Sequence, residues 1–267
     1  MSTWHTTLPL QELLYFADEH VALYCGDCAR ILPELPLDGG FGFSDPIYNV
    51  GKDYGVCKDR MSEDEYLAFT RSWMEPLKRC AANCIFTPNK WAFDYWAMLG
   101  RDYKPVVLTW AAAAAIRGNW IAMYSLLLTN AKPTRFGVPD WWSNTQRAGL
   151  GFLCKEQTYD HPGYTSEDIT NRVLEYFAPA QATVIDPFAG SGTTLWCAKL
   201  RGRRAIGIEI DEKWCRVAQT RCAQTVLDLG GLGGGERADA ENPEEGTEPL
   251  LREILRLAAE QAPTHIV

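Results

Sequence analysis

Asp45, Pro46 and Tyr48 stand together in the segment SDPIYN, directly after the apolar run GGFGF. An exocyclic amine of adenine or cytosine is a poor nucleophile, because its lone pair is delocalised into the ring. The Asp45 carboxylate and the Pro46 carbonyl, held by the fixed φ of proline, can accept hydrogen bonds from both N–H groups and localise that lone pair. Tyr48 can stack on a base that has left the duplex, which is typically worth about 1–3 kcal/mol. This spacing predicts transfer of a group to an amino nitrogen, with no metal required.

A glycine-rich segment, DPFAGSGTT at 186–194, follows a second apolar run, ATVI. Gly190 and Gly192 allow backbone N–H groups to approach a ligand closely, before a helix that begins near Thr193. Glu209 comes 19 residues after Gly190, at the end of the run AIGIEI, where a carboxylate often binds two ribose hydroxyls. No Gly-Lys-Ser/Thr follows the loop, which excludes a P-loop. Together these residues predict a nucleoside-containing cofactor.

The elements that must position these residues alternate between short apolar runs and helical stretches, a pattern typical of an α/β fold with a mostly parallel sheet. Strands are expected at residues 20–25, 39–45, 83–88, 104–110, 120–131, 182–186 and 204–211. Helices are expected at residues 62–81, 90–100, 166–178, 193–202 and 212–229. Ser62 with Glu65 forms a capping-box pattern, and Ser166 is expected to be the N-cap of its helix.

Three segments depart from this alternation. Residues 131–160 are rich in turn-forming residues and are expected to be irregular. Five alanines, Ala111–Ala115, fill a connection between two predicted strands, and composition gives no physical reason for them. Residues 230–248 are rich in Gly and Glu and predict a flexible linker, whereas residues 249–261 predict a short amphipathic helix. That helix can dock on the body of the chain or form a contact in a homodimer.

The charge and cysteine content of the chain limit the classes of partner and the cellular location that it can have. The chain of 267 residues has a formal net charge of −8, of which the nine acids and three bases from Asp228 onward contribute −6. Residues 1–227 therefore carry −8 − (−6) = −2, which is compatible with a local basic groove for nucleic acid. The nine cysteines are expected to be reduced thiols, since Cys25 and Cys28 have no obvious second pair of zinc ligands. No apolar run is long enough for a membrane span and no secretory signal is recognisable, so a cytoplasmic protein is expected.

The segment DPFAGSGTT resembles the AdoMet-binding motif of amino-group DNA methyltransferases, and DPIY resembles their catalytic D/N/S-P-P-Y/F motif. The catalytic motif comes first and the AdoMet motif last, which is the order of the β class. The resemblance spans about residues 23–226. It implies a Rossmann-like class I AdoMet-dependent methyltransferase fold with a small inserted target-recognition region, in a domain at residues 1–229.

The resemblance assigns further residues to the cofactor. It implies that AdoMet is bound by the following residues: Asp27, His161, Asp186, Phe188, Gly190, Gly192, Thr193 and Glu209. His161 and Pro162 match the start of the family's His-Pro-x-x-Lys-Pro element, but Thr165 and Ser166 stand where Lys-Pro is expected. A lysine contact at that element is therefore in doubt.

Ile47 is the second departure from the family pattern, because it replaces the second proline of the tetrapeptide. A following proline would keep Pro46 out of the α region, and Ile47 removes that restriction. The lost rigidity corresponds to about 0.4–1 kcal/mol of chain entropy. The hypothesis is that Asp45, Pro46 and Tyr48 keep their roles in a less pre-organised site.

Contacts with DNA are expected from two regions. In the loop after the catalytic motif and in residues 131–160, basic, aromatic and amide side chains can contact phosphates, wedge into a strand or read base edges. The candidates are Lys52, Lys58, Arg60, Arg135, Trp141, Trp142 and Asn144.

The sequence thus predicts an AdoMet-dependent methyltransferase that acts on a flipped base in double-stranded DNA, encoded by a bacterium or phage. Asp45 at the first position of the tetrapeptide favours adenine N6, with cytosine N4 as the alternative. A C5-cytosine enzyme is disfavoured because no cysteine follows a proline. RNA methylation is a weaker alternative, and a catalytically impaired DNA-binding relative is the rival that Ile47, the missing Lys-Pro and the alanine run support.

Overall fold

The computed structural model describes residues 4–35, 39–56, 59–110, 115–117, 120–122, 124–138, 140–144 and 166–224. These residues belong to one compact unit, residues 1–224, and the second unit, residues 225–267, lies outside them. The predicted linker at 230–248, the predicted helix at 249–261 and four of the five alanines at 111–115 are therefore outside the described residues. Within the described residues, no helix combines the length and apolar character needed to cross a membrane.

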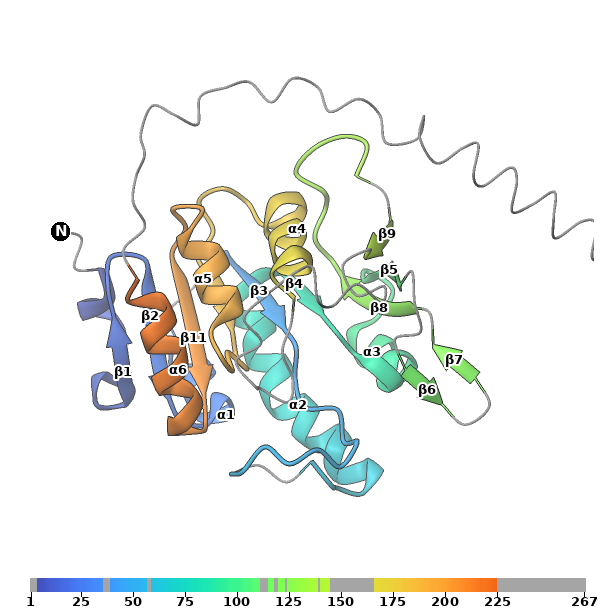
Figure 1. Cartoon of the computed structure of the whole chain (residues 1–267), viewed down its shortest axis with the longest axis horizontal. Helices are drawn as coiled ribbons and strands as arrows, with labels where there is room; N and C mark the ends of the chain where they lie inside the picture. The colour runs from blue at the N-terminus through green and yellow to red at the C-terminus, as the bar shows by residue number, and fades with distance from the viewer. Residues whose placement is uncertain are drawn as a thin grey trace, which may run out of the picture. The chain divides into compact units, whose positions relative to one another are not determined.

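The described residues form a nine-stranded sheet with the order β1-β2-β11-β10-β3-β4-β8-β5-β9 (Figure 1). Its strands are β1 (Leu14–Ala17), β2 (Val21–Cys25), β3 (Gly40–Ser44), β4 (Ala81–Phe86), β5 (Lys104–Trp110), β8 (Tyr124–Thr129), β9 (Trp141–Asn144), β10 (Val184–Asp186) and β11 (Ala205–Glu209). Neighbours from β2 to β4 are parallel, β8 is antiparallel to β4 and β5, and β9 is parallel to β5. A separate hairpin, β6 (Ala115–Arg117) and β7 (Trp120–Ala122), lies in the connection from β5 to β8. The predicted α/β fold with a mostly parallel sheet is confirmed.

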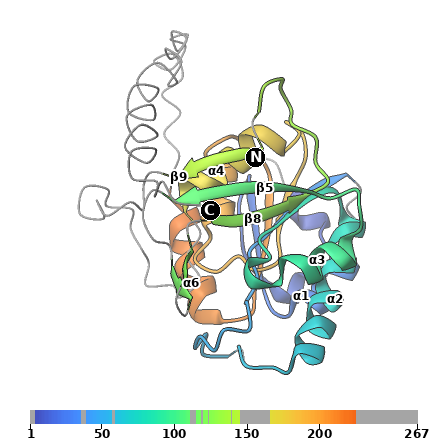
Figure 2. The same cartoon turned by 90° about the vertical axis from the view of Figure 1, so that its right-hand side faces the viewer.

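Helices cover both faces of the sheet (Figure 2). One group comprises α1 (Cys28–Ile31), α2 (Glu63–Cys80) and α3 (Ala92–Leu99), and the other comprises α4 (Glu167–Phe177), α5 (Thr193–Lys199) and α6 (Glu212–Cys222). Short 3₁₀ turns occupy Trp4–Thr7, Gln11–Leu13, Leu32–Glu34 and Asn89–Trp91. Two buried clusters reflect this arrangement. Val21 and Leu23 pack with residues of α4, α5 and α6, whereas Ala22 and Tyr24 pack with residues of α1, α2 and α3. Successive residues of β2 thus face opposite layers, as both-sided burial of a parallel sheet requires.

Most predicted elements are found where the sequence placed them, and the capping box of α2 is present. The Ser62 hydroxyl accepts a hydrogen bond from the Glu65 N–H at 3.3 Å, and the Glu65 carboxylate accepts one from the Ser62 N–H at 2.8 Å. The expected single strand at 120–131 is instead divided into β7 and β8. Ser166 precedes α4, but its buried hydroxyl makes no capping bond and has no partner among the described residues.

The expectation that residues 131–160 are irregular is wrong for Trp141–Asn144, which form β9 at the edge of the sheet. Trp142 anchors this strand. Its side chain is only 4% exposed and lies 5.5 Å from the Tyr176 ring and 5.8 Å from the Phe177 ring of α4. Four residues are too few to show a period of two, so the turn-forming residues around them dominated the prediction.

Candidate active site

The two Asp-Pro motifs, far apart in the sequence, are brought together by adjacent strands. β3 and β10 pair in parallel, with Val184 opposite Phe41 and Ile185 opposite Gly42. Asp45 follows β3 and Asp186 ends β10, so both carboxylates lie at the carboxyl edge of the sheet. The connections leave these two neighbouring strands in opposite directions, toward β4 and toward β11, and such a switch point is where open α/β sheets bind ligands.

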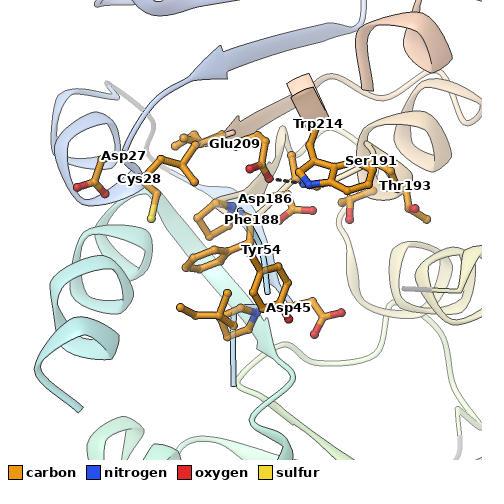
Figure 3. Close-up of a pocket in the computed structure, with 18 of the residues that line it drawn as sticks. Asp27, Cys28, Asp45, Tyr54, Asp186, Phe188, Ser191, Thr193, Glu209 and Trp214 are labelled. Carbon is orange, nitrogen blue, oxygen red and sulfur yellow. Dashed lines mark hydrogen bonds between the residues drawn. The ribbon is translucent and has the colours of Figure 1, made fainter. Parts of the chain in front are cut away.

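A cavity of about 980 Å³, partly open to solvent, lies at this edge and is lined by both motifs (Figure 3). Residues 45–48 form one side, and the loop after β10 forms another. Asp27, next to β2, and Glu209, at the end of β11, also line the cavity.

Asp45 is held by two hydroxyl groups. Thr87, which follows β4, donates a hydrogen bond from its Oγ1 to Asp45 Oδ1 at 2.7 Å, and the Tyr48 hydroxyl donates to the same oxygen. The Tyr48 and Thr87 hydroxyls are themselves 2.7 Å apart. Burial and the nearby Asp45 carboxylate raise the pKa of Tyr48 well above its ordinary value, so Tyr48 remains a donor. Both hydroxyls bind Oδ1, so they orient the carboxylate, whose other oxygen, Oδ2, can accept a hydrogen bond from an amino group that enters the cavity.

The glycine loop is fastened to β11 through Glu209. The Gly190 N–H donates to one Glu209 carboxylate oxygen at 2.8 Å, and the Asp211 N–H donates to the other at 2.9 Å. Burial raises the pKa of Glu209, while these backbone hydrogen bonds act in the opposite direction. An ionised carboxylate has about four lone-pair sites, so Glu209 can still accept a hydrogen bond from a hydroxyl of a bound nucleoside.

Of the other residues predicted for the cofactor, most line the same cavity, namely Asp27, Asp186, Phe188, Gly190 and Thr193. Gly192 is not among the lining residues, and His161 lies outside the described residues. Asp27 caps α1 by accepting a hydrogen bond from the Ala29 N–H at 2.9 Å. The Phe188 ring packs edge-on against Trp73 at a centroid distance of 5.0 Å. The Thr193 hydroxyl accepts a hydrogen bond from the buried guanidinium of Arg221 at 2.9 Å, which ties α5 to α6.

The arrangement has counterparts among known proteins. Residues 89–220 match the family model of the N6/N4 DNA methylases. The putative methylase YubD of Escherichia coli K12 is 45% identical over 219 residues, which cover 74% of this chain and 88% of YubD. The chain belongs to the N6/N4 DNA methylase family.

Solved structures of similar proteins have the same fold. The cytosine-N4-specific PvuII DNA methyltransferase matches with a TM-score of 0.57 and 14% identity, covering 91% of this chain and 95% of that one. The putative DNA modification methylase TTHA0409 of Thermus thermophilus, solved with S-adenosyl-L-methionine, matches with a TM-score of 0.53 and 20% identity, covering 76% and 93%. The fold of this DNA methylase is therefore the class I AdoMet-dependent methyltransferase fold expected from the sequence.

The cavity fits AdoMet, the cofactor of this DNA methylase. AdoMet carries a cationic sulfonium, an adenine ring and a ribose with two hydroxyls. Carboxylates line the cavity on several sides, which suits a cation, and aromatic rings offer surfaces for a base. The acidic residues are Asp27, Asp45, Asp186 and Glu209, and the aromatic residues include Tyr48, Tyr54, Phe188 and Trp214.

Two of the residues predicted to contact DNA are not placed for it in this methylase. Trp142 is buried against α4, so the prediction that it wedges into DNA is wrong. Arg135 lies in the loop beside the carboxyl-terminal end of α4, where it pairs with Glu175 at 3.1 Å and its guanidinium covers the Tyr176 ring at 4.7 Å. That loop lies at the ends of the strands that face away from the cavity, at the top of Figure 1. The loop after β3, which helps to form the cavity, lies at the bottom.

The other predicted DNA contacts fall into two groups. Lys52 and Arg60 are exposed in the loop that leaves the catalytic motif. Lys58 lies outside the described residues, as do the side chains of Trp141 and Asn144. β8 is antiparallel to both β4 and β5, so β5 runs in the same direction as β4 and β3. Because β9 is parallel to β5, the last residue of β9 lies at the same end of the strands as the cavity.

Sequence reasoning missed Thr87, Tyr54 and Trp214, which contact the motif or line the cavity. Thr87 follows the apolar run of β4, so a polar residue at the end of a strand next to β3 was a usable signal. Tyr54 and Trp214 come from a loop and from α6, and their position depends on tertiary packing that a sequence pattern does not show.

Gly192 is required by both its backbone conformation and its packing. Its φ is +80°, and a Cβ added there would lie 2.9 Å from the Ala218 Cβ of α6. We expect Gly192→Ala to lower the free energy of unfolding by about 1–3 kcal/mol more than Gly202→Ala. The Gly202 substitution is a matched control, since Gly202 has a φ of +64° with no atom within 4 Å of the added Cβ. Urea denaturation of both variants measures the difference, and equal losses would show that the contact with Ala218 is unimportant.

Asp186 makes stability depend on pH. Burial, with smaller contributions from Asp45 and Glu209, raises its pKa from 3.8 to about 7, although hydrogen bonds from Thr194 and Phe188 oppose the shift. The folded protein therefore binds a proton that the unfolded chain releases, so this contribution to stability is present below pH 3.8 and is lost as the pH rises through about 7.

Asp186→Asn removes this titration, so the stability of the variant relative to the parent is expected to increase from pH 5 to pH 8 by at least about 1 kcal/mol. Urea denaturation without AdoMet at the two pH values measures the change. A relative stability that is the same at both values would contradict a raised pKa at Asp186.

Proposed function

We propose that this DNA methylase transfers the methyl group of AdoMet to the N6 amino group of adenine in double-stranded DNA. The observation that carries the proposal is the single cavity lined by Asp45, Pro46 and the glycine loop. When bound, AdoMet supplies an activated methyl group on its sulfonium. The Asp45 carboxylate and the Pro46 carbonyl accept the two amino N–H groups of the flipped base, and Glu209 with Asp27 binds the nucleoside part of the cofactor.

The proposed target base, adenine, has one specific alternative. Asp45 as the first residue of the tetrapeptide favours adenine. The chemistry at an exocyclic amine is the same for both bases, so the site can serve either. The match with the cytosine-N4-specific PvuII methyltransferase favours cytosine N4. Cytosine N4 is therefore the second candidate.

Contacts with DNA are proposed at the edge of the sheet that holds the cavity. Lys52 and Arg60 extend from the catalytic loop and can contact phosphates near the flipped base. β9 ends at the same edge of the sheet, and we assign target recognition to Trp141 and Asn144 of this strand. Arg135 is left out because the loop that carries it, between β8 and β9, lies at the opposite end of the strands. The proposal also includes a methyltransferase domain that ends at residue 229 and a homodimer. The expected location is the cytoplasm of a bacterium or of a phage-infected cell.

Expression in a host that lacks DNA methylation tests the target directly. Mass spectrometry of nucleosides from the host DNA is expected to show N6-methyladenine, and the same host with an empty vector is the control. N4-methylcytosine in its place would establish the alternative. Methylated bases in RNA without any in DNA would contradict the proposed substrate.

A further inference from the structure

The carbonyl of Ile47 has a partner from outside the catalytic motif. Ile47 stands where the family has a second proline, and its carbonyl accepts a hydrogen bond from the Tyr66 hydroxyl of α2 at 2.9 Å. Tyr66 is completely buried, so this hydrogen bond is shielded from competition with water. A buried donor fixed on a rigid helix restrains the peptide between Ile47 and Tyr48 without a proline ring.

The next carbonyl along the chain is held from the same cluster. The Trp91 indole N–H donates to the Tyr48 carbonyl at 2.8 Å, and the Trp91 ring stacks on Tyr66 at a centroid distance of 4.6 Å. Lys90 donates to the carbonyl of Asn49 at 2.8 Å. Three successive carbonyls of the motif therefore accept hydrogen bonds from side chains outside it.

The Ile47 carbonyl sets the direction of the hydrogen bonds that Tyr66 makes. The Tyr95 hydroxyl, also fully buried, lies 3.2 Å from the Tyr66 hydroxyl. The Ile47 carbonyl can only accept, so Tyr66 uses its proton there and Tyr95 donates to the Tyr66 oxygen. Burial raises the pKa of Tyr66 to about 12, which keeps that proton in place at neutral pH.

We propose that Tyr66 is a positioning residue, which replaces the missing second proline by fixing the Ile47–Tyr48 peptide and thereby aims the Pro46 carbonyl and Asp45 at the amino group. The inference rests on the proposed roles of Asp45 and Pro46. Tyr66 does not line the cavity, so it acts through the peptide it holds.

The test is a double-mutant cycle on single-turnover methyl transfer with saturating AdoMet and duplex DNA. The four proteins are the parent, Tyr66→Phe, Ile47→Pro and the double variant. In the parent background, Tyr66→Phe is expected to lower the rate by about 10- to 100-fold, since small misplacements of catalytic groups have effects of that size. In the Ile47→Pro background, the proline supplies the restraint, so Tyr66→Phe is expected to lower the rate by less than about 3-fold.

Tyr103→Phe is the matched control, because it removes the hydroxyl of a buried tyrosine whose ring packs against Phe86 and whose hydroxyl interacts with Cys84 and not with residues 45–48. It is expected to keep the parent rate, and all variants are compared for AdoMet affinity and thermal unfolding.

An equal loss of rate from Tyr66→Phe in both backgrounds would overturn the proposal. A loss of rate that is explained by partial unfolding of the variant would also overturn it. If Tyr66→Phe keeps the parent rate while Asp45→Ala is inactive, the positioning role fails and the proposed function stands. If Asp45→Ala is as active as the parent, the proposed site itself fails.

Discussion

Asp45→Ala is expected to lower the single-turnover rate of methyl transfer by about 10²- to 10³-fold, the effect of removing one preorganised group that stabilises a transition state. The Asp45 carboxylate is fixed by the hydroxyls of Thr87 and Tyr48 at the wall of the cavity, so the acceptor is already oriented before the base enters. Without the carboxylate, one amino N–H loses its acceptor and the lone pair remains delocalised. Rapid-quench measurement with duplex DNA and saturating AdoMet gives the rate of this step.

Asp53→Ala is the control for Asp45→Ala. Asp53 is an exposed acid in the loop after the motif, and its carboxylate accepts a hydrogen bond from the Gly55 N–H at 2.8 Å. The control removes the same charge from the same loop and is expected to keep most of the activity. Calorimetry is expected to show that Asp45→Ala still binds AdoMet. A parent-like rate for Asp45→Ala would exclude this carboxylate as the acceptor.

Glu209→Ala is expected to weaken AdoMet binding by about 10- to 100-fold, which corresponds to the loss of hydrogen bonds to a charged group. Glu209 lies at the end of β11 and lines the cavity, where its carboxylate can accept ribose hydroxyls. It also holds the Gly190 N–H, so its removal releases the glycine loop as well. Both consequences reduce affinity for the cofactor, and isothermal titration calorimetry measures their sum.

Two further variants separate direct binding from the effect on the loop. Glu209→Gln keeps one carbonyl oxygen that can accept the Gly190 N–H, but it loses the acceptor of the Asp211 N–H. A loss in this variant therefore reports on the ribose contact and the Asp211 hydrogen bond, and not on release of the glycine loop. Glu212→Ala removes an exposed acid nearby on α6, which pairs with Arg216 at 3.2 Å, and is expected to bind AdoMet like the parent. Equal affinity of the Glu209→Ala and Glu212→Ala variants would refute the assignment of Glu209 to the cofactor.

Much of the framework could be predicted from the sequence because buried parallel strands and capped helices leave local signals. The apolar runs of β2, β3, β10 and β11 end in polar or glycine-containing turns, and the capping box at Ser62 marks the start of α2. The order of the motifs then implied that Asp45 and Glu209 share one site, and both line the cavity.

What could not be predicted depends on contacts between distant segments. Trp142 has the residue type of a DNA wedge, but its neighbours in α4 bury it. Arg135 follows a strand whose antiparallel direction takes the chain to the edge away from the cavity, and single-sequence patterns do not give strand direction. The substitution at Ile47 suggested a looser motif, whereas the hydrogen bond from Tyr66 is visible only once α2 is packed against the motif.

The most direct test of the proposed chemistry is to follow a labelled methyl group from AdoMet into unmethylated duplex DNA, using the purified parent protein and the Asp45→Ala variant. After digestion to nucleosides, mass spectrometry locates the label. We predict labelled N6-methyladenine from the parent and no more than about 1% of that amount from Asp45→Ala in the same time, as expected for a 10²-fold slower step. Label on carbon 5 of cytosine, or equal labelling by the two proteins, would contradict an amino-group methyltransferase that works through Asp45.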